Sequence, residues 1–282
     1  MSLPTRTGRN ERDFVLEDAE FEVIRQLVRQ HTGIALSDSK RELVYSRLVR
    51  RLRRLGMDNF GDYIDLLQTG PDEELEEFSN AITTNLTAFF RENHHFEYLT
   101  ETALPMLQKR NAASRRLRIW SAGCSTGEEP YSIAMVLQAE MSRFAGWDVR
   151  ILATDIDSQV LGHAMAGRYA ADRVERVPSR YARCFTANDD GTHSIRADVQ
   201  SLISFRQLNL MQPWPMRGPF DIIFCRNVVI YFDKPTQVEL FGRISSLQRE
   251  GDYLFVGHSE SLFKVCDRYD LIGKTAFRRL PG

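Results

Sequence analysis

Long apolar runs are missing from this 282-residue sequence, and their absence limits where the protein acts. No apolar run reaches the roughly 18 residues that a membrane-spanning helix needs, and the polar start MSLPTRTGRNERD lacks the apolar stretch of a signal peptide. We therefore expect a cytoplasmic protein that does not insert into a membrane. With 43% apolar and 27% charged residues, the composition is typical of one large or two ordinary globular domains.

The sequence also has few cysteines and almost no net charge. The four cysteines, Cys124, Cys184, Cys225 and Cys266, form no C-x-x-C pair, which argues against a zinc site and against a disulfide framework. We expect reduced thiols and no bound metal. The formal net charge is -1, so general attraction to nucleic acid is not expected, although this balance leaves room for a local basic face.

Strand patterns are absent from the first third of the chain. Between residues 14 and 90, apolar residues recur at three- and four-residue spacing, which predicts a small helical domain. Gly56 is placed to end its second helix, and Gly70-Pro71 separates the third helix from the fourth. Residues 91–114 predict a linker helix, in which Pro105 fits only near a bend or in a new first turn.

From residue 115 to residue 282 the sequence pattern predicts apolar strands that alternate with helices. This alternation predicts an α/β domain with a doubly wound parallel sheet, whose ligands bind at the carboxyl ends of the strands. The alternation fails at about residues 174–204, where the sequence around Asp189-Asp190-Gly191 predicts a small antiparallel β-subdomain inserted in the larger domain.

The stretch IWSAGCSTGEEPYSIAMVL, residues 119–137, combines a buried strand, a loop of small residues and a helix. Gly123 lets the backbone approach a ligand closely. The spacing is not the G-x-G-x-x-G of dinucleotide sites, no G-K-[ST] follows, and a pyrophosphate would be repelled by Glu128 and Glu129. These two carboxylates suit a cationic cofactor better than a phosphate-bearing one. S-adenosylmethionine, which carries a sulfonium and an ammonium and no phosphate, is a reasonable candidate.

Polar residues follow two further strands. Asp155 is placed to accept hydrogen bonds from ribose hydroxyls, and Asp157 is placed to cap the next helix. Asn209 and Leu210, after the strand ISFRQ, offer a polar contact and an apolar face to an adenine, although about half of such dipeptides are simply strand ends.

Five motifs occur in order along the chain: ITTNLTAFFRE (82–92), SAGCSTGEEPYSIA (121–134), ATDID (153–157), FDIIFCRNVVIYFD (220–233) and GHSE (257–260). Together they resemble the chemotaxis receptor methyltransferases, the CheR family, over residues 14 to 280. The resemblance implies a class I methyltransferase domain preceded by a helical domain. It also implies transfer of the methyl group of S-adenosylmethionine to glutamate side chains on the cytoplasmic helices of chemoreceptors, with S-adenosylhomocysteine as product. The resulting glutamate methyl esters would serve chemotactic adaptation.

The resemblance also implies site residues, motif by motif. With Gly123 from the loop, the cofactor contacts are Asn85, Thr87, Arg91, Glu128, Asp155, Asn209, Leu210, Arg226 and Asn227. Glu128 would hold the methionine ammonium, and Arg91 and Tyr231 would orient the incoming carboxylate. A glutamate carboxylate is already ionised at neutral pH, so the reaction requires no general base, and His94 and His95 are interpreted as helix face residues.

A basic face is expected on the second helix, where Arg47, Arg50, Arg51 and Arg54 lie beside an apolar stripe. A solvated surface is the usual explanation, but a receptor helix bearing several glutamates would be a complementary partner. The inserted subdomain is a candidate for binding the receptor's C-terminal tail as an added strand. Family members that use such a tether tend to have several glycines there, whereas CFTANDDGTHSIR has only Gly191.

Two other functions compete with this one. A nucleic acid methyltransferase would share the cofactor fold and use the arginines on phosphates, but the chain has CRNVVIYF where an N-P-P-Y type motif is expected. A non-catalytic receptor-binding module that senses the cofactor or another nucleotide is disfavoured by the retention of Arg91, Asp155 and Tyr231.

Overall fold

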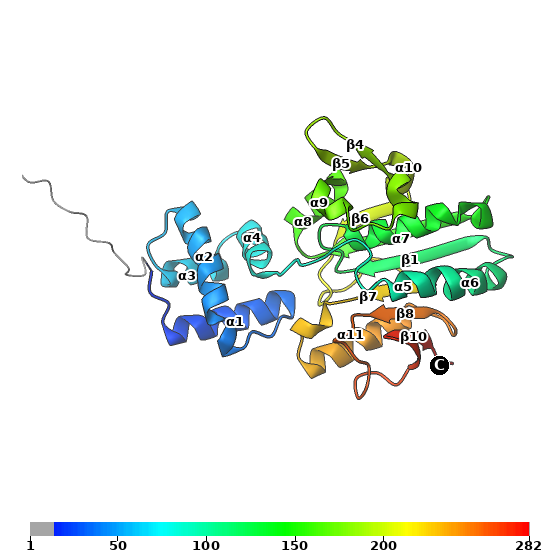
Figure 1. Ribbon diagram of the computed structural model, residues 1–282. Helices are drawn as coiled ribbons and strands as arrows, with labels where there is room; N and C mark the ends of the chain where they lie inside the picture. The colour runs from blue at the N-terminus through cyan, green and yellow to red at the C-terminus, as the bar shows by residue number, and fades with distance from the viewer. Residues whose placement is uncertain (1–13, 282) are drawn as a thin grey trace, which may run out of the picture. The chain divides into compact units, whose positions relative to one another are not determined.

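The computed structural model describes residues 14–281, which form two compact units (Figure 1). A helical unit contains residues 14–31 and Leu36–Ile82, and an α/β unit contains Thr32–Ala35 and residues 83–281. The helical unit therefore ends before the expected boundary at residue 90, because the segment that starts at Thr83 packs with the α/β unit. No helix among the described residues is both long enough and apolar enough to cross a membrane.

The helical unit is built from α1 (Asp18–Thr32), a 3-10 turn (Asp38–Lys40), α2 (Arg41–Leu55), α3 (Phe60–Thr69) and α4 (Asp72–Ile82). Fully buried side chains of α2, α3 and α4 form its core, among them Leu48, Leu52, Phe60, Tyr63 and Phe78. Gly56 ends α2 in the left-handed region, with φ of 69°, as the sequence predicts.

The main sheet has seven strands in the order β6-β2-β1-β7-β8-β10-β9. Five of them are parallel: β1 (Arg116–Ala122), β2 (Asp148–Asp155), β6 (Ile203–Gln207), β7 (Ile222–Cys225) and β8 (Tyr253–Val256). The last two, β9 (Tyr269–Gly273) and β10 (Ala276–Arg279), pair antiparallel because the turn between them is too short for a crossover helix. The doubly wound sheet is thus confirmed, with an antiparallel hairpin at one edge that the sequence alone did not indicate.

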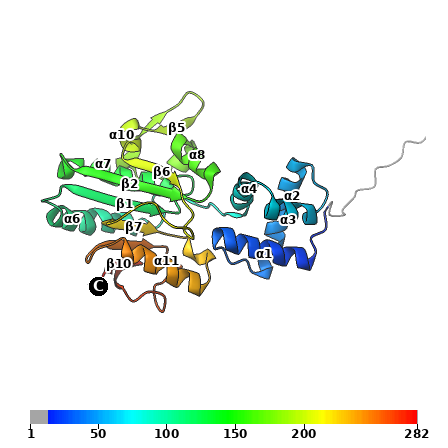
Figure 2. The same ribbon diagram turned by 180° about the vertical axis from the view of Figure 1, so that it is seen from behind.

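Helices cover both faces of this sheet (Figures 1 and 2). One face packs against α5 (His94–Tyr98), a π-helical turn (Leu99–Ala103), α6 (Leu104–Arg110), α7 (Glu128–Ala139) and α8 (Ser158–Ala166). The other face packs against α11 (Lys234–Ser246), and neighbouring strand residues such as Ile119 and Trp120 belong to the two different cores. Pro105 lies in the first turn of α6, one of the two positions that the sequence allows for it.

A separate three-stranded antiparallel sheet, in the order β3-β5-β4, is inserted in the α/β unit. Its strands are β3 (Arg168–Ala170), β4 (Phe185–Ala187) and β5 (Thr192–Ile195). It begins earlier than residue 174 and ends before residue 204, because Ile203–Gln207 joins the main sheet as β6, beside β2. Short helical pieces connect the strands: α9 (Ala171–Val174), a 3-10 helix (Ser179–Cys184) and α10 (Ala197–Gln200), and two more 3-10 turns lie elsewhere at Met141–Phe144 and Val229–Tyr231.

Candidate functional site

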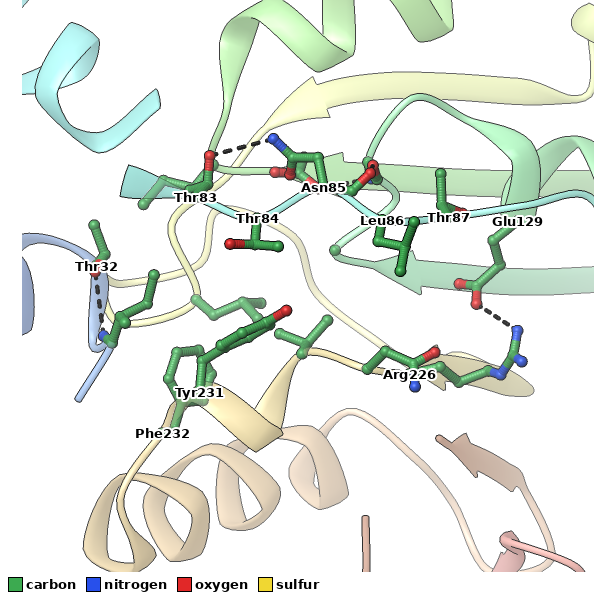
Figure 3. Close-up of a pocket in the computed structure, with 18 of the residues that line it drawn as sticks. Thr32, Thr83, Thr84, Asn85, Leu86, Thr87, Glu129, Arg226, Tyr231 and Phe232 are labelled. Carbon is green, nitrogen blue, oxygen red and sulfur yellow. Dashed lines mark hydrogen bonds and ion pairs between the residues drawn. The ribbon is translucent and has the colours of Figure 1, made fainter. Parts of the chain in front are cut away.

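A pocket opens at the carboxyl ends of β1, β2, β6 and β7, where the sequence predicts the ligand site. Its lining includes eight of the ten predicted cofactor residues, namely Asn85, Thr87, Arg91, Gly123, Asp155, Leu210, Arg226 and Asn227, and also Tyr231. Figure 3 shows the Tyr231 ring and Arg226 on one side of the pocket and the Thr83–Thr87 segment on the other. Glu128 and Asn209 are not among the lining residues that the structure describes.

The segment Thr83–Arg91 forms one wall of the pocket without being helical, and hydrogen bonds to other parts of the α/β unit fix its course. The Asn85 amide donates to Asp157 Oδ2 at 2.7 Å, and the Ser125 hydroxyl donates to the Asn85 carbonyl at 3.0 Å. Arg91 Nη1 donates to the Leu86 carbonyl at 2.7 Å, within the segment. These contacts hold a polar strip of backbone and side chains against the pocket.

The first turn of α7 places two adjacent carboxylates in different surroundings. Glu128 is fully buried, accepts hydrogen bonds from Thr126 Oγ1 at 2.6 Å and Arg173 Nη2 at 2.7 Å, and lies outside the pocket lining. Glu129 lines the pocket, since successive helix residues point about 100° apart. Glu129 is therefore the carboxylate of this helix turn that lines the pocket, and the sequence-based choice of Glu128 for the methionine ammonium stays a prediction with Glu129 as its alternative.

Glu129 is held by two donors. Its Oε1 accepts from the Ser121 hydroxyl at 2.7 Å, and its Oε2 accepts from Arg226 Nη1 at 2.9 Å (Figure 3). Burial raises the pKa of Glu129, and the Arg226 guanidinium opposes that rise. The side chain of Arg226 is only 2% exposed and also lies 3.4 Å from Glu92, so one buried cation serves two carboxylates.

Asp155 ends β2 at the pocket and is 8% exposed. Its Oδ2 accepts from the Ser125 backbone N–H at 2.7 Å and its Oδ1 from the Asp157 N–H at 3.0 Å. Burial raises the pKa of Asp155 to about 6, against the effect of these hydrogen bonds. Asp157 caps α8 as predicted, by accepting from the backbone N–H groups of Gln159 and Val160.

A glycine is required at position 123 because its backbone lies close to the side chain of Val228. The φ of Gly123 is 81°, and an added Cβ atom would lie 2.4 Å from Cγ2 of Val228, which also lines the pocket. Any other residue would therefore be strained and would fill space at the pocket.

The apolar part of the pocket was largely missed from the sequence. Asn209 is not among the described lining residues, and its Oδ1 accepts from the Met211 N–H at 2.9 Å. Its neighbours on both sides, Leu208 and Leu210, line the pocket with Ile156 and Val228. The alternation Leu-Asn-Leu after β6 was the available signal, because side chains in extended backbone alternate in direction.

His95, which the sequence analysis interprets as a helix face residue, lies in α5 and is fully buried. Its Nε2 lies 2.9 Å from Thr275 Oγ1, and burial lowers its pKa to about 3. Glu92, His94 and His95 lie close enough together to share a metal ion. A cation there would compete with the guanidinium of Arg226, which already pairs with Glu92, so we interpret the cluster as part of an ion-pair network.

The family of the chain follows from comparison with known sequences. The family model described as CheR methyltransferase, SAM binding domain, matches residues 85–278, and the model described as CheR methyltransferase, all-alpha domain, matches residues 19–83. The chain belongs to the CheR methyltransferase family. It is therefore a methyltransferase with an S-adenosylmethionine-binding domain, and its relatives act in chemotaxis.

Three relatives of this CheR methyltransferase cover nearly its whole length. A probable chemotaxis protein methyltransferase of Rhizobium etli is 43% identical over 89% of this chain and 96% of the relative. The chemotaxis protein methyltransferase of Klebsiella aerogenes is 44% identical over 93% of this chain and 90% of the relative. The protein of the same name from Escherichia coli is 43% identical over 93% and 91%.

The pocket of this CheR methyltransferase fits the chemistry of S-adenosylmethionine. Two carboxylates, Glu129 and Asp155, supply acceptors for an ammonium and for ribose hydroxyls, and Leu208, Leu210 and Ile156 supply an apolar surface for an adenine. The Arg226 charge is offset by Glu129 and Glu92, so Arg226 does not present an unpaired charge to the sulfonium.

Asp155 gives a prediction for the pH dependence of binding. We expect Asp155→Ala to weaken S-adenosylhomocysteine binding by about 1–3 kcal/mol at pH 8, since charge-assisted hydrogen bonds are lost. Because the pKa of Asp155 in the ligand-free protein is raised to about 6, wild-type affinity should fall as the pH drops through 6, where protonation competes with the ligand. The variant should lose part of this fall. Isothermal titration calorimetry from pH 8 to pH 5 measures both effects.

The matched control is Asp148→Ala, at the exposed amino end of the same strand. It should bind S-adenosylhomocysteine like the wild type at each pH. Unchanged affinity of Asp155→Ala would remove Asp155 from the site.

Proposed function

We propose that this methyltransferase esterifies glutamate side chains on the cytoplasmic helices of chemoreceptors, producing glutamate methyl esters for chemotactic adaptation. One observation carries the proposal beyond the family name: among the described residues that line the pocket there is no histidine, lysine or cysteine. The two carboxylates there, Glu129 and Asp155, are already engaged by hydrogen-bond donors. An acceptor that needs no deprotonation, such as a carboxylate, suits a pocket without a general base.

The roles of the pocket residues follow from their positions. Glu129, in place of Glu128, would hold the methionine ammonium of the cofactor, and Asp155 would hold its ribose. S-adenosylmethionine supplies a methyl group activated by the positive sulfur. Arg91 would orient the acceptor carboxylate with its fork of donors, and Tyr231, whose hydroxyl points into the pocket in Figure 3, would fix the second oxygen.

In this mechanism the enzyme accelerates methyl transfer by positioning the two reactants and by excluding water from them. A carboxylate and a sulfonium neutralise each other as the methyl group moves, so the reaction is favoured by an environment that removes water from both charges. Holding the two reactants in line lowers the activation free energy by about 7 kcal/mol or more. The apolar residues of the pocket wall, such as Leu208 and Val228, exclude water on the cofactor side.

The basic face on α2 is smaller than the sequence suggests. Arg51 is 12% exposed and forms ion pairs with Glu74 and Glu77 of α4, and Arg47 donates to the Ile82 carbonyl. Arg50 is exposed, and Arg54 is 72% exposed and 3.9 Å from Glu77. We therefore propose that receptor docking depends on Arg50 and Arg54, while Arg51 stabilises the helical unit.

This docking surface gives a kinetic prediction. Replacing Arg50 and Arg54 with alanine should raise the receptor KM about 2- to 30-fold at low salt, since each exposed charge contributes up to about 1 kcal/mol. Added salt should shrink the difference because it screens exposed charges. Steady-state methylation of a receptor fragment at several salt concentrations measures this, and cofactor affinity should not change.

The control for this prediction is the charge-matched pair Arg115→Ala and Arg116→Ala, two exposed arginines at the amino end of β1. This pair should leave the receptor KM unchanged. If the Arg50 and Arg54 double variant keeps the wild-type KM at low salt, α2 carries only a solvated surface, and docking must be sought first in the inserted sheet.

The inserted sheet is a second candidate contact for the receptor, through its C-terminal tail. Both β3 and β4 are edge strands of that sheet, and a tail would add a strand there. Against this, the β4–β5 turn has a single glycine, Gly191, and is closed by hydrogen bonds that Asp190 accepts from Thr192. We keep the tail as an optional contact in the proposal.

The reaction is tested by incubating the enzyme with methyl-labelled cofactor and three acceptors: receptor fragments, duplex DNA and RNA. Label retained on the receptor alone supports the proposal and eliminates a non-catalytic cofactor sensor. Label on nucleic acid would assign the arginine face to phosphates and overturn the proposal.

A further inference from the structure

The loop after β7 supplies one side of the cofactor pocket. Arg226, Asn227, Val228 and Tyr231 all line the pocket, and they lie in the segment between β7 and the end of the 3-10 turn Val229–Tyr231. Asn227 has a φ of 59°, a conformation that a residue with a side chain adopts only at a cost in free energy. The surrounding structure must hold this loop in place.

One buried carboxylate makes the contacts that hold it. Glu260, only 5% exposed, accepts hydrogen bonds from four backbone N–H groups. Its Oε1 accepts from Val228 and Val229, both at 2.9 Å, and its Oε2 accepts from Asn227 at 2.9 Å and Gly257 at 2.5 Å. Three of these four donors belong to the pocket loop.

The geometry requires the ionised form of this side chain. All four partners are donors, so a protonated carboxyl would direct its own proton at an N–H group. Burial raises the pKa of Glu260, and the four hydrogen bonds act against that rise. Converging backbone N–H groups of this kind form an anion-binding nest, which is here filled by the protein's own carboxylate.

Gly257 permits the approach of the two loops. A Cβ atom on Gly257 would lie 2.5 Å from Asn227 Nδ2 and 2.9 Å from the Asn227 backbone nitrogen. The motif Gly257–Glu260 after β8 thus contains both the residue that allows the contact and the residue that makes it.

We infer that Glu260 is a positioning residue of the cofactor site: through the N–H groups of residues 227–229 it sets the loop conformation that places Arg226, Asn227 and Val228 at the pocket. Glu260 is not among the described lining residues, so it acts through the loop and not by touching the cofactor. The inference rests on cofactor binding and not on the identity of the methyl acceptor. Failure of the glutamate proposal would leave it intact.

A buried acid at the opposite end of β7 offers a matched control. Asp221 is 2% exposed and accepts from the Arg118 backbone N–H and the Asn111 amide, both at 2.8 Å, just before β7 begins. It also accepts from Arg110 Nη2 and Arg249 Nη2, so it is as buried as Glu260 and accepts as many hydrogen bonds, but it does not line the pocket and lies at the other end of β7. Loss of either acid should destabilise the protein, and only loss of Glu260 should disturb the cofactor site.

The experiment compares Glu260→Gln with Asp221→Asn in the full chain. For each variant we would measure the Kd of S-adenosylhomocysteine by calorimetry and, in the ligand-free protein, hydrogen–deuterium exchange of peptides covering residues 226–232. Glu260→Gln turns a donor amide toward two of the four N–H groups, so we expect a Kd at least ~10-fold higher and faster exchange in those peptides. Asp221→Asn should lower the Tm but leave the Kd within about twofold of wild type.

A wild-type Kd for Glu260→Gln would overturn the inference, and so would equal losses of affinity in the two variants, since that pattern means general destabilisation. If Glu260→Gln does not fold, Gly257→Ala tests the same contact from the other loop. It should also raise the Kd and speed exchange at residues 226–232, and a folded Gly257→Ala variant with wild-type Kd would overturn the inference.

Discussion

Replacement of Glu129 by glutamine is expected to weaken S-adenosylhomocysteine binding about 10- to 100-fold, since a hydrogen bond to a charged group contributes about 1.5–3 kcal/mol. Glu129 is the carboxylate of α7 that lines the pocket, and it offers the negative charge that an amino acid ammonium requires. Its replacement also leaves Arg226 with only Glu92 as a charged partner. The pocket then becomes more positive, which disfavours a cationic cofactor. Calorimetry at pH 8 measures the effect.

The neighbouring residue provides the control. Glu128→Gln should change the Kd only a few-fold, because Glu128 pairs with Arg173 and Thr126 outside the pocket lining. It should instead lower the Tm, since the ion pair between the buried Glu128 and Arg173 is lost. The reverse order of affinities would contradict the geometry and restore Glu128 as the ammonium-binding residue.

The second large effect is expected at Arg91. Arg91→Ala should lower kcat about 100-fold or more, because orientation and electrostatic contacts that matter most in the transition state typically contribute that much. Arg91 lines the pocket, and one nitrogen of its guanidinium donates to the Leu86 carbonyl, which fixes the fork in direction. Single-turnover methylation of a receptor fragment at saturating cofactor measures the rate.

Two further variants show how Arg91 acts. Arg91→Lys keeps the charge but loses the fork, so an intermediate rate is expected if two oxygens are oriented together. Tyr231→Phe removes the hydroxyl proposed for the second oxygen and should lower kcat with little change in cofactor Kd. A wild-type kcat for Arg91→Ala would contradict the role, and parallel loss of kcat and cofactor affinity would show that Arg91 also binds the cofactor.

Several parts of the site were predictable from the sequence because they depend on local backbone chemistry. Gly123 at the end of a strand, Asp155 at the end of the next and Asp157 before a helix are defined by strand ends and helix starts, which short-range patterns reveal. The carboxyl ends of parallel strands meet at one edge, so Gly123 and Asp155 converge on one pocket.

Other parts depend on tertiary contacts that no local pattern contains. The choice between Glu128 and Glu129 depends on the rotation of one helix turn, and the partner Arg173 of Glu128 comes from the inserted subdomain. Arg51 looks like its exposed neighbours in sequence, but Glu74 of another helix pairs with it. The role of Glu260 cannot be recognised in the sequence either, because three of its four partners are backbone groups more than thirty residues away.

The central claim is that the acceptor is a glutamate carboxylate, and mass spectrometry of a receptor fragment after incubation with enzyme and cofactor tests it most directly. The account predicts that individual glutamate residues gain the mass of one methyl in place of one hydrogen, and that mild alkali removes the added mass, as it does for an ester. Modification that survives alkali, or that maps to lysine, arginine or another side chain, would contradict the account.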